Sequence, residues 1–209
     1  MSDRNSGDIG AVTPGHYGSD VTGVALSEAV IATAWNVQGD PAHAAFVTCA
    51  QQLFDVPLPM DPNTTTRGDG VNALWLGPRS WLLVEGAPSG RPAMLTDFRA
   101  KRDELNARAG ALFDVSASRI AYRVGGIHAA SVLAKSCPLD FDSGVFPVNG
   151  CAQSVFGHVN ALFFREDAAS TFSMLVARSF AHDTWRLLCR SSAQYVYDVT
   201  APRPIAESG

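Results

Sequence analysis

Residues 114–153 read DVSASRIAYRVGGIHAASVLAKSCPLDFDSGVFPVNGCAQ, and this stretch decides the fold of the chain. It predicts a strand from Arg119 to Gly125, a helix over about 127–135 and a proline-containing loop up to Asn149. Most of its residues are of the kind that builds a fold, and the groups that could carry out a reaction are scattered along it. The pattern therefore favours a structural role over a catalytic one.

The residues before this stretch predict a first unit that begins with a strand over 30–37. Asp40 and Pro41 follow it, and these residue types are preferred at the N-cap and at the first position of a helix. Apolar residues then recur at spacings of three and four up to Phe54. We therefore expect a helix over about 41–54.

A hairpin and a second helix complete the first unit. VNALWLG and SWLLVEG are two short apolar strands, and the turn residues 77–80 separate them. Pro92 can open a helix that turns Leu95, Phe98 and Leu105 toward the sheet. The predicted order of the first unit is β-α-β-β-α.

The residues from 114 onward repeat that order. After the strand and helix of the opening stretch, strands are predicted near 152–164 and at 171–177, followed by a helix over about 180–190. We therefore predict an α+β fold of two pseudo-repeated β-α-β-β-α halves, with helices packed on mostly antiparallel sheets. The expected organisation is a flexible N-terminal tail over 1–22, one domain over 23–192 with halves of about 23–110 and 111–192, and a C-terminal tail over 193–209.

Composition and charge exclude several classes of partner. The chain has 209 residues, 46% of them hydrophobic and 17% charged, with a formal net charge of -4. A basic stripe that would grip nucleic acid or anionic lipid is not apparent. The first residues do not resemble a signal peptide, and no segment approaches the ~20 apolar residues needed to cross a bilayer. We expect a cytoplasmic protein that contacts neither nucleic acid nor membrane.

Asp114 is the sharpest candidate for acid-base chemistry, because it lies in an apolar strand where burial would raise its pKa. The competing interpretation is a hydrogen bond to nearby backbone or to Ser116, Ser118 or Arg119. No base or nucleophile lies at a sequence spacing from Asp114 that would indicate a catalytic pair. The other acid-base candidates are Asp140, Asp142, Glu166 and Asp183.

The histidines and cysteines show no metal-ligand spacing. His43 and His128 occupy similar positions at helix starts in the two halves, which fits either a shared site or helix capping and partner contact. Gly125 and Gly126 lack the GxGxxG spacing of a dinucleotide site, so we expect them to turn the strand into the helix. The remaining histidines are His16, His158 and His182, and the cysteines, expected to be free and mostly buried, are Cys49, Cys137, Cys151 and Cys189.

Two further sets of side chains have alternative interpretations. Trp75, Trp81 and Trp185 could stack on a pterin, although core packing is the simpler role. Arg119, Arg123 and Arg178 could pair with acidic groups of a partner subunit, or face solvent.

Four stretches together resemble the gamma-subunit family of heterotetrameric sarcosine oxidase, over about residues 24–190. That family is in turn similar to the folate-binding fold of the glycine-cleavage aminomethyltransferase. The stretches are LWLGPRSWLLV (74–84), FDVSASRIAYRVGG (113–126), CPLDFDSGVFPVNGCAQ (137–153) and TFSMLVARSFAHDTWRLL (171–188).

The resemblance implies an assembly that oxidatively demethylates sarcosine to glycine, hydrogen peroxide and formaldehyde or methylene-tetrahydrofolate. The implied partners are the alpha, beta and delta subunits, and the implied cofactors, which are FAD, FMN, NAD, tetrahydrofolate and zinc, belong to those subunits. This chain is then a non-catalytic brace, with no catalytic, cofactor-binding or metal-binding residues of its own.

Two other functions remain possible at this point. One is a free-standing folate-dependent aminomethyltransferase-like protein, in which a buried carboxylate such as Asp114 contacts the pterin or the substrate amine. The other is a folate-sensing or scaffold protein outside the oxidase. Co-purification with flavoprotein subunits, or tight tetrahydrofolate binding by the pure chain, would separate these functions.

Overall fold

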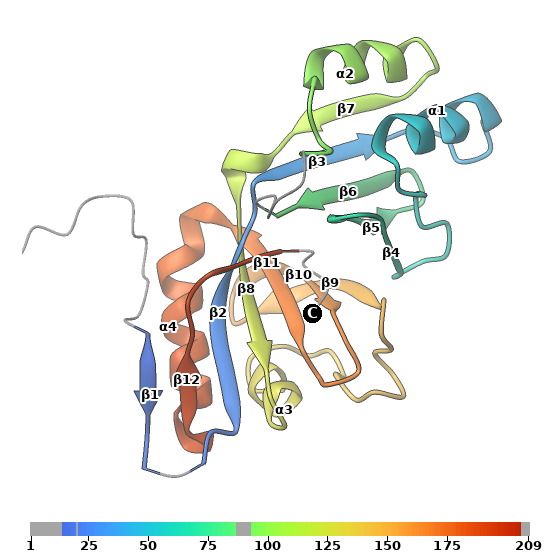
Figure 1. The fold of residues 1–209 in the computed structure, drawn as a ribbon. Coiled ribbons are helices and arrows are strands. Elements are labelled where there is room, and N and C mark those ends of the chain that lie inside the picture. The colour runs from blue at the N-terminus through green and yellow to red at the C-terminus, as the bar shows by residue number, and fades with distance from the viewer. Residues whose placement is uncertain (1–13, 20, 87–92, 206–209) are drawn as a thin grey trace, which may run out of the picture.

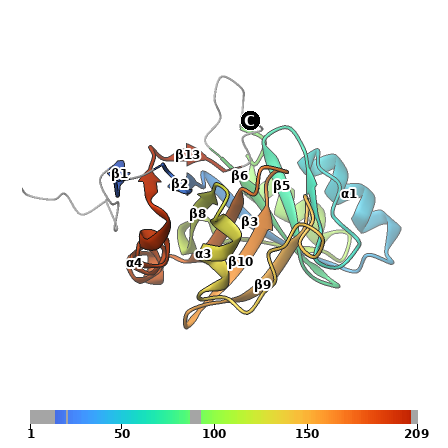
Figure 2. The same cartoon turned by 90° about the horizontal axis from the view of Figure 1, so that it is seen from below.

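Two sheets pack face to face, and each carries its helices on the outer face (Figure 1). The structure is a computed structural model that describes residues 14–19, 21–86 and 93–205. Helices α1 and α2 lie on the outer face of the first sheet (Figure 1), and the layers then run through the second sheet to helices α3 and α4 (Figure 2). This confirms the predicted mixed α+β class, with helices packed on mostly antiparallel sheets.

The first sheet has five strands, all antiparallel to their neighbours. Helices α1 (Ala44–Phe54) and α2 (Phe98–Asn106) cover one face of it, where Trp35, Phe46 and Leu105 are buried. The β5–β6 hairpin confirms the predicted pair of short apolar strands. The strands are β3 (Thr33–Gln38), β4 (Thr65–Arg67), β5 (Val71–Gly77), β6 (Ser80–Glu85) and β7 (Ala111–Asp114), in the order β4-β5-β6-β3-β7.

Helix α1 begins later than the sequence predicts. Asp40 and Pro41 form a turn, in which the Asp40 carboxylate accepts hydrogen bonds from the Ala42 amide at 3.0 Å and from Arg79 at 2.6 Å. His43 is the N-cap residue, and its side chain makes no capping bond. Asp40 therefore orders the turn before the helix and does not cap the helix itself. Pro92, the expected start of the second helix, lies outside the described residues.

The second sheet has eight strands, and helices α3 (Ala129–Ala134) and α4 (Ala181–Ser192) cover its outer face. Its main strand order is β1-β12-β2-β8-β11-β10-β9, with β13 also paired to β2. The strands are β1 (Gly15–Tyr17), β2 (Val24–Val30), β8 (Arg119–Gly125), β9 (Cys151–Phe156), β10 (Val159–Arg165), β11 (Phe172–Ala177), β12 (Tyr197–Val199) and β13 (Arg203–Pro204). The 3-10 helices are η1 (Ser116–Ser118), η2 (Arg178–Phe180) and η3 (Ala193–Tyr195).

The chain crosses between the sheets at two neighbouring places, and the sequence analysis missed both. The predicted strand over 30–37 is instead the end of β2 in the second sheet and β3 in the first, separated by Ile31 and Ala32. The chain returns through η1, after β7 has paired with β3. The division between the sheets therefore does not fall at residue 110, because β7 joins the first sheet and β2 joins the second.

Counted from β3 and from β8, each predicted β-α-β-β-α unit contains one more strand than predicted. The order after β3 is α1, β4, β5, β6 and α2, and the order after β8 is α3, β9, β10, β11 and α4. The predicted strand region 152–164 divides into β9 and β10 at Gly157, whose φ of 62° suits a tight turn. The regions expected as tails also contain paired strands, since β1 pairs with β12, and both β12 and β13 pair with β2.

A shared apolar layer joins the two sheets. The first sheet contributes Leu74, Leu82 and Val84 to this layer, and the second contributes Phe164 and Leu175 among others. Burial of these side chains is worth about 1.5–3 kcal/mol each. Among the helices in the described part of the chain, none is long and apolar enough to span a membrane.

Glu85 holds the segment before α2 against the first sheet. Its fully buried carboxylate accepts hydrogen bonds from the amides of Met94 at 2.7 Å and Leu95 at 3.0 Å, and its carbonyl accepts one from Ala32 at 2.9 Å. Burial removes the water that would hydrate the carboxylate, and hydrogen bonds from two backbone amides compensate for that loss. Glu85 thus connects the first crossing to the start of the α2 region.

We expect Glu85→Ala to lower the free energy of unfolding by about 3 kcal/mol, because it leaves the buried Leu95 amide and the part-buried Met94 amide without acceptors. Glu85→Gln should cost less, since its amide oxygen still accepts one of the two bonds. Urea denaturation of the two variants measures both effects. A loss below about 0.5 kcal/mol in Glu85→Ala would contradict this role.

Candidate functional site

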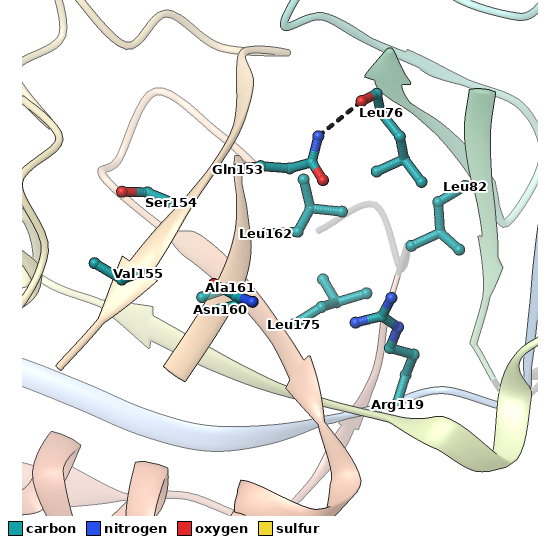
Figure 3. A pocket seen from close by; sticks show the side chains of 10 residues that line it. All are labelled: Leu76, Leu82, Arg119, Gln153, Ser154, Val155, Asn160, Ala161, Leu162 and Leu175. Carbon is teal, nitrogen blue, oxygen red and sulfur yellow. Dashed lines mark hydrogen bonds between the residues drawn. The ribbon is translucent and has the colours of Figure 1, made fainter. Parts of the chain in front are cut away.

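A groove of about 600 Å³ lies where the β5–β6 hairpin of the first sheet meets the inner face of the second sheet. Figure 3 shows its lining side chains, which come from both sheets. They are mainly apolar at the centre, with amides at one end and a guanidinium at the other. The lining residues are Leu76, Leu82, Arg119, Gln153, Ser154, Val155, Asn160, Ala161, Leu162 and Leu175.

Strand register places most of the groove on one face of the second sheet. Leu162 pairs with Gln153 on β9 and with Leu175 on β11, so these three side chains share a face. Leu76 and Leu82 form the opposite wall from the first sheet. The Gln153 amide donates a hydrogen bond to the Leu76 carbonyl at 2.8 Å, which ties β9 to the hairpin (Figure 3).

Arg119 and Arg123 lie on the same face of β8, but among the described residues only Arg123 has an ionic partner. The Arg123 Nε donates to the Glu166 carboxylate at 2.8 Å, and each of these side chains is 14% exposed. Ser173 also donates to Glu166. Arg119 instead lines the groove, and its buried Nε has no hydrogen-bond partner among the described residues.

Arg178 hydrogen-bonds to the backbone at the start of β8, and no acidic partner for it is found in the described part of the chain. Its guanidinium donates to the carbonyls of Ala117 at 3.1 Å and Arg119 at 2.9 Å. The three arginines that the sequence analysis grouped together therefore have three different environments. Arg123 is ion-paired within the chain, Arg178 donates hydrogen bonds to backbone carbonyls, and Arg119 lines the groove.

Asp114 is exposed, so the expectation that it is buried in an apolar strand is wrong. It ends β7, an edge strand of the first sheet, and its carboxylate accepts hydrogen bonds from the Ser116 amide at 2.9 Å and the Ser116 hydroxyl at 2.6 Å. The competing interpretation, a local bond that orders the backbone, is confirmed. Asp114 is not among the residues that line the groove.

The other acidic candidates are also dispersed. Asp140 accepts a bond from the Asp142 amide, and Asp142 accepts one from the Gly144 amide, each at 2.9 Å. Asp183 is exposed in the first turn of α4, 4.0 Å from His182. Glu166 is committed to Arg123 and Ser173. These groups order loops or pair internally, and the structure does not bring them together.

The histidines are dispersed as well. His43 and His128 are the N-cap residues of α1 and α3, as their similar positions predict, but neither side chain makes a capping bond. His128 stacks on Tyr195 with ring centroids 4.5 Å apart, and His158 meets the edge of a phenylalanine ring. His16 lies 2.6 Å from Asp198, and this hydrogen bond holds the pKa of the Asp198 carboxyl below its usual value. Within the described ranges, no three His, Cys, Asp or Glu side chains are grouped to hold a metal ion.

Of the three tryptophans that could have stacked on a pterin, two are core residues, as core packing predicts. Trp81 is 1% exposed and donates to the Pro59 carbonyl at 2.7 Å, and Trp185 is 4% exposed and packs on Tyr122. Trp75 is half-buried and contacts the first-sheet core. Trp81 and Trp185 belong to different core clusters, so the tryptophans do not form one stacking box.

The cysteines are free, and Cys189 is half-buried while the other three are buried. Cys151 donates to the carbonyls of Thr64 at 3.2 Å and Trp75 at 3.6 Å, and burial raises the pKa of its thiol to about 11. Gly126 has a φ of 102°, and a Cβ there would lie 2.6 Å from the Gly23 carbonyl oxygen. Gly126 therefore serves the turn into α3, as expected, whereas Gly125 is the last residue of β8.

Comparison with known proteins gives a consistent family. Residues 38–194 match the model of the sarcosine oxidase gamma subunit family. The chain belongs to this family. Sarcosine oxidase subunit gamma from Corynebacterium sp. (strain P-1) is 28% identical over 185 residues, covering 88% of this chain and 87% of the relative. Its counterpart from Corynebacterium sp. (strain U-96) is 30% identical over 161 residues, covering 76% and 73%.

Solved structures show the same likeness. A chain of the heterotetrameric sarcosine oxidase from Corynebacterium sp. U-96, in complex with pyrrole 2-carboxylate, superposes with a TM-score of 0.72 at 25% identity, covering 82% of this chain and 85% of that one. The glycine cleavage system aminomethyltransferase T from Bartonella henselae superposes with a TM-score of 0.54 at 14% identity, covering 87% of this chain and 48% of that one. The second likeness concerns the fold alone.

The sequence analysis did not find the groove. Its lining comes from strands β5, β6, β8, β9, β10 and β11, which are far apart along the chain, and no local spacing relates them. Gln153 was noted only as the end of a motif, and Asn160 was not singled out. Arg119 was noted as a possible partner of Asp114 and as one of three arginines that could pair with a partner subunit, but not as part of a groove.

We expect Cys151 to stay unmodified when the native protein is treated with iodoacetamide at pH 8. Its pKa of about 11 leaves about one thiol in a thousand ionised at that pH, and the side chain is buried. Peptide mapping by mass spectrometry, with the urea-unfolded protein as the control in which all four cysteines react, measures this protection. Rapid native labelling of Cys151 would identify it as an accessible thiolate.

Proposed function

We propose that this chain is the gamma subunit of a heterotetrameric sarcosine oxidase and that it braces the complex without contributing a catalytic residue. The observation that carries this proposal is membership of the gamma subunit family, together with a superposition that covers most of both chains. The complex would oxidatively demethylate sarcosine to glycine, hydrogen peroxide and formaldehyde or methylene-tetrahydrofolate.

The chemistry of the described residues supports a non-catalytic role. The buried ionisable groups Glu85 and Arg165 bind backbone, since Arg165 donates to the carbonyls of Phe146, Asp167 and Ala168. Buried Cys151 has a raised thiol pKa, which opposes nucleophilic attack. A general base and a nucleophile within hydrogen-bond reach, which covalent catalysis needs, are not found together around the groove lining.

The partners and cofactors follow from the same proposal. The alpha, beta and delta subunits would surround this chain in the cytoplasm, and FAD, FMN, NAD, tetrahydrofolate and zinc would be bound by those subunits. We also infer that residues 23–192 arose by duplication of one structural unit. The matching order β-α-β-β-β-α in the two halves supports this origin.

The alternative of a free-standing folate-dependent transferase depended on a buried carboxylate, and the structure does not favour it. Asp114 is exposed and bonded to Ser116, and Arg119 is the charged residue in the groove lining. A carboxylate able to contact a pterin or an amine is therefore not offered by these lining residues.

Co-expression of this chain with the other three subunits tests the proposal. We expect a complex that purifies intact, absorbs near 450 nm because of its flavins and oxidises sarcosine, whereas this chain alone should lack flavin absorption. Native mass spectrometry gives the subunit composition. A stable chain that never associates with the flavoprotein subunits would refute the proposal.

Asp114→Ala tests the absence of a catalytic role. We expect the assembled complex to keep its kcat for sarcosine within about twofold, and the unfolding free energy to fall by about 1 kcal/mol through loss of the bonds to Ser116. Steady-state peroxide production and urea denaturation measure the two effects. Tight tetrahydrofolate binding by the pure wild-type chain that Asp114→Ala abolishes would instead favour the transferase.

A further inference from the structure

The groove contains a cation that the described chain leaves without a counter-ion. Arg119 is the charged member of the lining, and its Nε is buried without a hydrogen-bond acceptor. Arg123, on the same face of β8, shows how this sheet satisfies such a group, because Glu166 pairs with it at 2.8 Å. Arg119 therefore lacks the partner that Arg123 has, and a carboxylate is the acceptor that a guanidinium binds best.

The groove also opens onto a free sheet edge. Strand β9 ends the second sheet. The amide of Cys151, its first residue, and the amide of Gly157, just after its last, point away from β10 to the carbonyls of Asn63 at 2.8 Å and Ser136 at 2.7 Å. Because orientation alternates along a strand, the backbone groups of Gln153 and Val155 point the same way. No backbone partner for them is found among the described residues.

Such an edge is a template for another polypeptide. Unpaired N–H and C=O groups in a strand attract extended chains, and native proteins usually cover them. Val155 beside them is 36% exposed, although its side chain is apolar and faces the groove. An open backbone edge and an apolar entrance favour a protein segment over a small molecule.

We propose that the groove seats an extended segment of a partner subunit that carries a carboxylate. The segment hydrogen-bonds to the β9 edge at Gln153 and Val155, crosses Leu162 and Leu175, and places the carboxylate on Arg119. This crossing spans three strand spacings, about 14 Å, which four or five extended residues cover. The inference rests on the proposed function, because it names the site through which the gamma subunit contacts its assembly.

Charge variants test the ionic contact in the reconstituted complex. We expect Arg119→Glu to weaken binding of this chain to the other three subunits by at least about tenfold, and Arg119→Gln to weaken it less. The matched control is Arg99→Glu, which makes the same charge change at an exposed position on α2, and it should change affinity less than about twofold. Biolayer interferometry gives the affinities, and circular dichroism melting checks that each variant is folded.

A photo-crosslinking residue at Val155 tests the location without altering Arg119. We expect a crosslink to one partner segment that contains an Asp or Glu within about five residues of the crosslinked site. Replacing that carboxylate with an amide should weaken assembly as Arg119→Gln does, and the two changes together should cost little more than one. The same photo-crosslinker at position 99 is the control.

The possible outcomes separate the two proposals. If the wild-type chain does not assemble with the flavoprotein subunits, the proposed function fails and this inference fails with it. If it assembles, but Arg119→Glu binds normally or position 155 gives no crosslink to a partner, only the groove assignment is overturned. Binding of adipate to the isolated chain that Arg119→Gln abolishes, while assembly is unchanged, would assign the groove to a small carboxylate instead.

Discussion

The apolar layer between the two sheets is the constraint on which the rest of the structure depends. Each sheet is apolar on both faces, and the helices cover only the outer faces. The inner faces must therefore bury each other, because apolar surface left in water would forfeit about 25 cal/mol per Å². The crossings near Ala32 and at η1 place the sheets in this arrangement, and Glu85 fixes the chain beside the first crossing.

A groove lies where two sheets of unequal size pack together. Five strands face eight, and the hairpin residues Leu76 and Leu82 form one wall against the larger sheet. One face of β8 carries both the Arg123–Glu166 pair and Arg119, which lines the groove. The sheet packing that stabilises the fold thus also leaves Arg119 and the edge of β9 available. Both features suit a subunit of a larger assembly.

Local features were predicted well because local physics decides them. The β5–β6 hairpin follows from two apolar runs around a short turn, and β8 extends from Arg119 to Gly125 as predicted. Strand β4 was missed because its three residues lie in a polar stretch and pair only through tertiary contact. Asp114 was predicted to be buried because its sequence neighbours are apolar, but apolar neighbours do not distinguish an edge strand from a central strand.

The sequence by itself determined the secondary-structure signals, the mixed α+β class and the family, since these depend on local pattern and on ordered motifs. Only the tertiary structure decided which charged groups are paired. Arg119 and Arg123 are four residues apart in one strand, and nothing local distinguishes them. The carboxylate of Glu166, 43 positions from Arg123, pairs with Arg123 because the register of β8 and β11 and the turn after β10 bring it there.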